Sequence, residues 1–231
     1  MVLHGWGRGV EKWQGFKKEL EKSGFEVFLP ELPGFGQTTA PEKAWNVNDY
    51  LDWLKPQLPL KYWLISHSFG GRIAIKLASQ HPAGLKGLIL ISSAGIKPRP
   101  SWKKFGFLVL AKVGRTVCFL PPFCLIRGLA RKALYCLVGS RDYYQAPGVM
   151  KKTLRQVVAE DLQPLLKKIK IPVLILWGES DQVTPLKDAR LINQLIKGSQ
   201  LKTFPGSDHL LPFQQTQSVI KTITEFIKKY L

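Results

Sequence analysis

The segment Tyr62–Gly71, with the sequence YWLISHSFGG, decides the fold. Residues 62–65 are apolar and β-prone, as in a buried strand, and the stretch 72–80 that follows has the apolar spacing of a helix. So tight a strand-to-helix turn holds its central residue, Ser68, in a strained backbone conformation and pushes the side chain clear of the sheet. The segment therefore predicts a reactive serine at this turn.

Two features of the turn favour Ser68 as a nucleophile. Strand and helix nearly collide there, so small residues are needed two positions before and after it, and Ser66 and Gly70 meet that need. Glycine is usual at the first of these positions, so Ser66 is a departure that still keeps the side chain small. The amino terminus of the following helix also places partial positive charge beside Ser68.

Short apolar runs alternate with longer amphipathic ones along the chain. The strand-like runs are Val2–Leu3, Phe25–Leu29, Tyr62–Ile65, Leu85–Ile91, Val173–Trp177 and Leu201–Phe204. The helical patterns are Trp13–Lys22, Val47–Leu58, Gly71–Gln80, Leu186–Ile196 and Gln215–Lys229. Strands separated by such helices predict an α/β fold with a mostly parallel sheet, whose functional loops follow the carboxyl ends of the strands.

A serine needs a base to remove its proton, and His209 is the candidate. The chain has four histidines. His4 and His67 sit beside the proposed site, and His81 ends a helical pattern. Only His209 is both remote in sequence and placed directly after the last predicted strand.

The carboxylate that orients this histidine is predicted to be Asp181, which follows the strand Val173–Trp177. Glu179 lies two residues earlier and stays open as an alternative. Asp208 is disfavoured because adjacent side chains on an extended segment point in opposite directions.

The negative charge that develops on a substrate oxygen needs hydrogen-bond donors, each worth about 3–4 kcal/mol. The turn His4–Gly7 follows the first strand, and its glycines let backbone amides turn inward. The backbone N–H groups of Trp6 and Phe69 are the predicted oxyanion hole. The glycine spacing over 5–9 differs from the dinucleotide motif, and no His, Cys and Asp cluster has ligand spacing, so we expect no cofactor and no metal.

Residues 96–156 interrupt the alternation and predict a small helical insertion in a core formed by 1–95 and 157–231. Between Lys97 and Arg155 there are thirteen basic residues and one acid, a net +12 of the total +18. Such a surface suits an anionic substrate or an anionic membrane surface, and nucleic acid is a less favoured partner.

Composition points to a globular protein, with 45% hydrophobic and 22% charged residues, and argues against disorder and coiled coil. No apolar run reaches the roughly 18–20 residues of a membrane-spanning helix. The first residues, MVLHG, lack the basic and apolar regions of a signal peptide, so we expect a cytoplasmic location.

Together these pieces resemble the α/β-hydrolase superfamily along nearly the whole chain. The matching motifs are HGWG (4–7), LPGFG (32–36), HSFGG (67–71), WGESD (177–181) and GSDH (206–209). The order serine, aspartate, histidine is that of this superfamily. The resemblance implies the α/β-hydrolase fold and a cap over the active site at 96–156. It argues against the epoxide hydrolase and haloalkane dehalogenase branches, which carry aspartate in place of Ser68.

The start of the chain departs from the resemblance. Relatives usually have two further strands before the His–Gly motif, whereas Met1 comes three residues ahead of His4 here. We therefore expect either a minimal version of the fold or a truncated start. The Phe25–Leu29 strand would then be an unpaired sheet edge, which predicts self-association as a homodimer through that edge.

The leading hypothesis is a serine hydrolase that cleaves a carboxylic ester or similar acyl compound through a Ser68–His209–Asp181 triad and an acyl-enzyme. Two alternatives stay open. The run Gly70–Arg72 resembles that of the carbon–carbon lyase of menaquinone synthesis, which shares this fold. The basic segment would also suit a protein that binds anionic surfaces without catalysis.

Overall fold

A computed structural model describes residues 1–7, 9–97 and 148–231. The chain divides into two compact units, one made of 1–97 with 148–231 and the other of 98–147. Most of the predicted cap lies outside the described residues, so the cap stays a prediction. Helix α7, Gly148–Ala159, is described and is part of the first unit.

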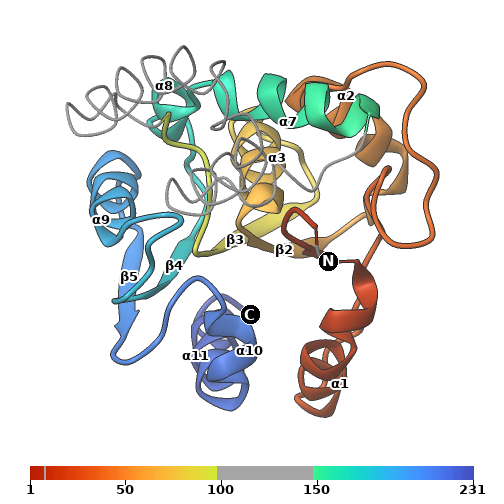
Figure 1. Cartoon of the computed structure of the whole chain (residues 1–231). Helices are drawn as coiled ribbons and strands as arrows, with labels where there is room; N and C mark the ends of the chain where they lie inside the picture. Colours follow the sequence, from red (N-terminus) through yellow and green to blue (C-terminus); the bar gives the residue numbers. More distant parts are fainter. Residues whose placement is uncertain (8, 98–147) are drawn as a thin grey trace, which may run out of the picture. The chain divides into compact units, whose positions relative to one another are not determined.

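Five parallel strands form one sheet in the order β1-β2-β3-β4-β5 (Figure 1). The strands are β1 (Val2–Leu3), β2 (Tyr62–His67), β3 (Leu85–Ile91), β4 (Val173–Gly178) and β5 (Gln200–Phe204). The parallel sheet predicted from the alternating pattern is therefore confirmed. Because all strands run the same way, the loops that follow them gather at one edge of the sheet.

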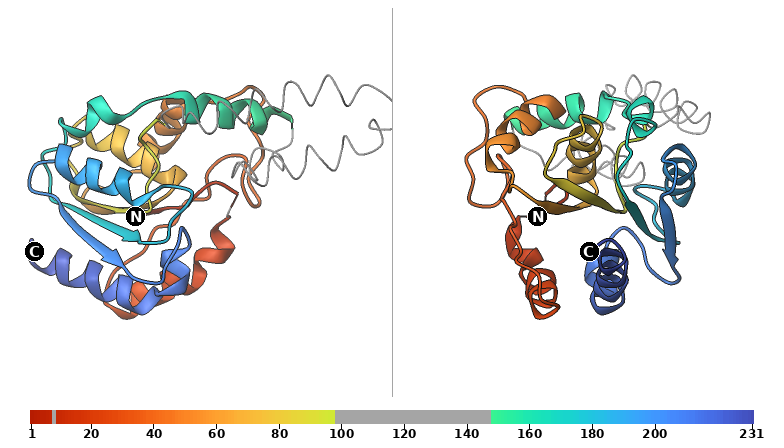
Figure 2. Two further views of the ribbon diagram at one scale, coloured as in Figure 1. Left: turned by 60° about the vertical axis from the view of Figure 1, so that its left-hand side comes forward. Right: turned by 180° about the vertical axis from the view of Figure 1, so that it is seen from behind.

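Helices cover both faces of the sheet (Figures 1 and 2). On one face lie η1 (Val10–Trp13), α1 (Gln14–Lys22), α10 (Leu211–Gln214) and α11 (Thr216–Lys228). On the other lie α2 (Val47–Leu54), η2 (Lys55–Gln57), α3 (Phe69–Ala78), α7, α8 (Gln163–Leu166) and α9 (Leu186–Leu195). The predicted helix Val47–Leu58 is thus an α-helix that tightens into a 3₁₀ turn at its end.

The core is formed by side chains that recur at every second residue of the strands and at every third or fourth residue of the helices. Along β3, Ile89 and Ile91 belong to the apolar cluster that α1 and α11 cover, while the alternate residues face the other side. Helix α11 contributes apolar residues at three- and four-residue steps, namely Val219, Ile220, Ile223, Phe226 and Ile227. Both faces of the sheet are buried, as in other parallel sheets, and this rigid frame holds the strand-end loops.

The predicted strand Phe25–Leu29 is not formed. The segment runs beside β1, where the Val2 amide donates to the Phe28 carbonyl at 2.8 Å, but no ladder develops. The alternation reflects which side chains of the segment are buried, whereas a strand also needs repeated backbone hydrogen bonds to a neighbour. Self-association through this edge stays a prediction.

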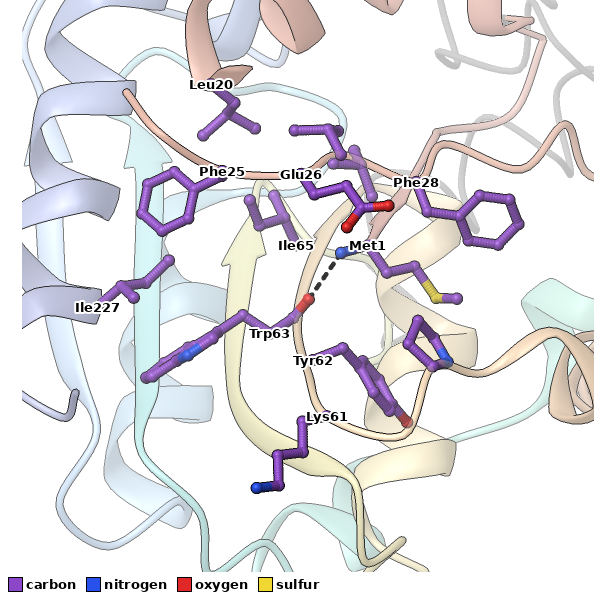
Figure 3. Close-up of a pocket in the computed structure, with 13 residues that line it drawn as sticks. Met1, Leu20, Phe25, Glu26, Phe28, Lys61, Tyr62, Trp63, Ile65 and Ile227 are labelled. Carbon is purple, nitrogen blue, oxygen red and sulfur yellow. Dashed lines mark hydrogen bonds between the residues drawn. The ribbon is translucent and has the colours of Figure 1, made fainter. Parts of the chain in front are cut away.

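An apolar pocket of about 270 Å³ lies at the same edge (Figure 3). Phe25, Tyr62, Trp63 and Ile227 are among its lining residues. The Met1 ammonium donates to the Trp63 carbonyl at 2.9 Å within it. None of the residues predicted to perform chemistry lines this pocket, so it is separate from the candidate site.

Candidate active site

Ser68 stands between the end of β2 and the start of α3, at the predicted turn. Its backbone has φ 50° and ψ −113°, a left-handed conformation that is strained for any residue but glycine. A Cβ at Gly70 would lie 2.6 Å from the Leu3 carbonyl oxygen, and one at Gly71 would lie 1.8 Å from Ser93 Oγ. Helix α3 therefore packs directly against β1 at Gly70 and against the loop that follows β3 at Gly71.

The three predicted triad side chains form one chain of hydrogen bonds. Ser68 Oγ lies 2.9 Å from His209 Nε2, and His209 Nδ1 lies 2.9 Å from Asp181 Oδ2. A carboxylate only accepts hydrogen bonds, so Nδ1 carries the proton and Nε2 is left to accept from the serine hydroxyl. The arrangement can move a proton from Ser68 to His209. It joins loops that follow β2, β4 and β5.

Asp181 is buried, with 3% of its surface exposed, and both carboxylate oxygens are occupied. Oδ1 accepts from the amides of Val183 and Thr184 at 2.8 and 2.9 Å, and Oδ2 accepts from His209 and from Thr184 Oγ1. Burial alone would raise the pKa of Asp181. The hydrogen bonds and charge of His209 and the bonds from Thr184 outweigh it, so the pKa lies below its ordinary value. Asp181 is therefore held ionised beside the imidazole.

The two other carboxylates near this site make different contacts. Glu179 is exposed and accepts from Thr203 Oγ1 at 2.8 Å, and Asp208 accepts from the Leu210 amide at 2.7 Å. The hydrogen bonds thus place Asp181, rather than Glu179 or Asp208, against the imidazole of the histidine.

Thr184 is a residue of the site that the sequence interpretation missed. Its Oγ1 lies 2.9 Å from Asp181 Oδ2, 3.2 Å from His209 Nδ1 and 3.1 Å from the Ser92 carbonyl oxygen. The Trp177 indole holds the same turn by donating to the Thr184 carbonyl at 2.7 Å. A threonine three residues after an aspartate is a common local turn pattern, and it was the available signal. Thr184 thus braces the carboxylate and the imidazole together.

His67 also contacts the loop that carries His209. Its Nε2 lies 2.9 Å from the His209 carbonyl oxygen, which can only accept, so Nε2 carries a proton. The two imidazole rings lie 5.0 Å apart between centroids. His67 therefore ties the loop that carries the base to the strand that carries the nucleophile.

The predicted oxyanion-hole residues lie next to each other. The Trp6 and Phe69 rings meet edge to face with centroids 5.2 Å apart, and Phe69 opens α3. A Cβ at Gly5 would come within 3.2 Å of Ser68 Cβ, so the loop that carries Trp6 passes directly against the nucleophile. The loop that carries Trp6 and the start of α3 therefore both lie beside Ser68.

His4 supports the start of this loop as a buried, neutral imidazole. Its Nδ1 donates to the Gly5 carbonyl at 2.9 Å, and its Nε2 accepts from the Leu32 amide at 3.0 Å. A protonated ring would turn an N–H toward the Leu32 N–H. Burial lowers the pKa of His4, against the opposing effects of the Gly5 carbonyl and Glu31.

We expect the folded protein to lose stability as the pH falls below about 6.5, the ordinary pKa of histidine. Because the folded pKa of His4 is lowered, the unfolded chain takes up this proton first. The contribution of His4 is complete above that pH and is lost as the pH falls toward the folded pKa. Melting temperatures of the wild-type protein between pH 8 and pH 5 measure the effect.

The variant His4→Gln should melt lower at pH 8 but show a flatter dependence on pH. His81→Asn, at the exposed end of α3, is the matched control, and asparagine tolerates the positive φ of that position. An unchanged pH dependence in His4→Gln would contradict the assignment to His4.

The described residues contain neither a metal-binding cluster nor a membrane-spanning helix. Among them, no group of three or more His, Cys, Asp or Glu side chains is arranged to hold a metal ion. Within 1–7, 9–97 and 148–231, no helix has the length and apolar content needed to cross a bilayer.

The chain matches known proteins over almost its whole length. A family model described as the alpha/beta hydrolase fold matches residues 1–111 and 127–216. An uncharacterized protein of Mycobacterium tuberculosis is 26% identical over 97% of this chain and 73% of its own length. The pimeloyl-[acyl-carrier protein] methyl ester esterase of Aeromonas hydrophila is 27% identical, covering 98% of this chain and 94% of that enzyme.

Solved structures share the fold. A thermophilic esterase from Thermogutta terrifontis superposes with a TM-score of 0.70 and 24% identity, covering 99% of this chain and 89% of that one. The enol-lactonase from Burkholderia xenovorans LB400 has a TM-score of 0.71 and 20% identity, covering 98% and 90%. At these identities the likeness concerns the fold alone.

Proposed function

Because the chain belongs to the alpha/beta hydrolase fold family, we propose that it is a serine hydrolase that cleaves a carboxylic ester or related acyl compound. The observation that carries this proposal is the hydrogen-bonded chain from Ser68 Oγ through His209 to Asp181, with 2.9 Å at each step. A relative named as a methyl ester esterase supports hydrolysis of an ester.

In the proposed acylation step, Ser68 Oγ attacks the carbonyl carbon of the ester while His209 Nε2 takes the hydroxyl proton. Asp181 stabilises the imidazolium that forms. The substrate oxygen gains negative charge, and the amides of Trp6 and Phe69 donate to it. His209 then returns the proton to the departing alcohol, and the acyl group stays on Ser68.

In the proposed deacylation step, a water molecule takes the place of the alcohol. His209 removes a proton from the water, the resulting hydroxide attacks the acyl carbon, and the bond to Ser68 Oγ breaks. Ser68 regains its proton from His209, and the acid leaves. Each group therefore returns to its starting state.

The lyase alternative rested on the run Gly70–Arg72. Arg72 is buried, with 3% of its surface exposed, and donates to the Glu160 carbonyl at 2.8 Å. Burial lowers the pKa of Arg72 to about 10, against the charges of Glu160 and Asp161. Lys76 on the same helix pairs with the Glu160 carboxylate. These contacts give Arg72 a structural role, so no observation favours the lyase over the hydrolase.

The proposal is tested by incubating the purified protein with a fluorophosphonate probe and with nitrophenyl esters of increasing acyl length. We expect the probe to label Ser68, located by peptide mass spectrometry, and the esters to be hydrolysed. In ¹⁸O-labelled water, hydrolysis places the heavy oxygen in the acid, whereas a lyase forms product without it. A folded protein that neither labels nor turns over esters would contradict the proposal and favour the binding alternative.

The substrate and partners beyond this class stay predictions. The net +12 between Lys97 and Arg155 supports an anionic acyl substrate or an anionic membrane surface. Comparing neutral with negatively charged acyl chains of the same length in the ester screen tests the first of these.

A further inference from the structure

Glu31 joins two loops that would otherwise be independent. It lies between Pro30 and Leu32, ahead of the loop Leu32–Gly36. Its Oε1 accepts from the Val10 amide at 3.1 Å, and its Oε2 accepts from the Gln37 amide at 2.8 Å. One carboxylate therefore holds the end of the loop that carries Trp6 and the end of the loop that runs beside it.

The loop that carries Trp6 is consequently fixed at both ends on two adjacent residues. At its start, His4 Nε2 accepts from the Leu32 amide, and at its end the Val10 amide donates to Glu31. Residues 5–9 span the distance between these two anchors and contain three glycines. Glycine leaves a free loop many conformations, so the anchors restrict the loop more than its own sequence does.

Space for the Glu31 carboxylate is provided by glycines on both loops. A Cβ at Gly9 would lie 2.8 Å from Glu31 Oε1, and one at Gly36 would lie 1.8 Å from the same atom. Any side chain at either position would displace the carboxylate. The two loops are therefore shaped around this one group.

We propose that Glu31 is a positioning residue that fixes the Trp6 amide of the oxyanion hole. The proposal rests on the proposed function, because it assigns Glu31 a part in the same reaction. Donors stabilise a developing oxyanion only when they are held in place before the charge appears. Glu31 supplies that restraint from a distance through Val10 and does not itself touch the substrate.

The first test compares Glu31→Gln and Glu31→Ala with the wild-type protein. The glutamine keeps the shape and one acceptor oxygen but turns an NH₂ group toward a backbone N–H. We expect kcat to fall about tenfold in Glu31→Gln and about a hundredfold in Glu31→Ala, with KM nearly unchanged, because the loss is in transition-state stabilisation. Binding of a trifluoromethyl ketone, whose adduct with Ser68 carries an oxyanion, should weaken in parallel with kcat/KM.

Glu19→Gln is the matched control. Glu19 is a glutamate on α1 that pairs with Lys22. We expect this variant to keep wild-type kinetics. A purely structural role for Glu31 would lower the melting temperature without separating kcat from KM.

A second variant perturbs the same contact without removing the charge. Gly9 has φ −57°, which alanine can adopt, so the main effect of Gly9→Ala is the collision of its Cβ with Glu31 Oε1. We expect the same pattern of lowered kcat and preserved KM. Hydrogen–deuterium exchange, which needs no substrate, should show faster exchange of peptides covering residues 5–10 in Glu31→Gln and in Gly9→Ala.

The outcomes separate this proposal from the proposed function. Wild-type kinetics and wild-type exchange in Glu31→Gln, in a protein that labels at Ser68, would overturn the role of Glu31 and leave the hydrolase intact. Failure of the wild-type protein to label or turn over would overturn both. Lowered kcat with faster exchange of residues 5–10 supports both.

Discussion

Replacing Ser68 with alanine is expected to lower kcat for ester hydrolysis by about 10⁴- to 10⁶-fold. In the proposed mechanism the Ser68 hydroxyl attacks the substrate, so without it no acyl-enzyme forms. Fluorophosphonate labelling should be lost together with turnover. Both are measured on protein whose circular dichroism matches the wild type.

The stability of this variant should change little, since the Ser68 side chain is half-buried and, among the described residues, its hydroxyl is hydrogen-bonded to His209 alone. Ser68→Gly is expected to be equally inactive but to melt higher, because glycine adopts φ 50° without the strain of about 1–3 kcal/mol. Ser79→Ala, at the far end of α3, is the matched control and should keep full activity. Ester turnover that survives in Ser68→Ala would mean that another group is the nucleophile.

Replacing Asp181 with asparagine is expected to lower kcat by about 10⁴-fold while the fold is retained. The Oδ1 position accepts two backbone amides, so the amide oxygen of the asparagine has to take it. Its NH₂ group then faces His209 Nδ1 and forces that nitrogen to accept. The imidazole proton moves to Nε2, which can no longer accept from Ser68. Steady-state kinetics with a nitrophenyl ester measure the loss.

Glu179→Gln and Asp208→Asn are the controls for this change, because they remove the two alternative carboxylates that the sequence offers beside the candidate site. Glu179 contacts Thr203, and Asp208 contacts the Leu210 amide, so both variants should hydrolyse esters at close to the wild-type rate. A large loss in Glu179→Gln with activity preserved in Asp181→Asn would transfer the orienting role to Glu179.

The positions of most strands and of the candidate triad side chains were predictable from local patterns. The rule that functional loops follow parallel strands led to Asp181 and His209, which the structure brings into one relay with Ser68. The prediction was wrong at Phe25–Leu29, which has the alternation of a strand. That alternation reflects which side chains are buried, whereas a strand also needs repeated backbone hydrogen bonds to a neighbour.

Thr184, His67 and Glu31 show what local patterns leave out. Each acts through a hydrogen bond to a residue that is distant in sequence, such as the bond from His67 to the His209 carbonyl or from the Val10 amide to Glu31. The turn pattern after Asp181 is a local signal for Thr184 itself, but nothing in the immediate neighbourhood of the three residues specifies these distant partners. Their roles are visible only once the loops have been brought together.

The sequence by itself determined the alternation of strands and helices, the serine at the tight turn, and the order of the triad. Those features are local, since they follow from side-chain period and from the size of the residues beside Ser68. Only the folded chain shows which carboxylate meets His209, which tautomer the imidazoles adopt, and which residues anchor the loop that carries Trp6. A hydrogen bond between two segments requires its donor–acceptor distance to be right to within a few tenths of an ångström. Only the packed sheet and its helices set distances between segments that closely.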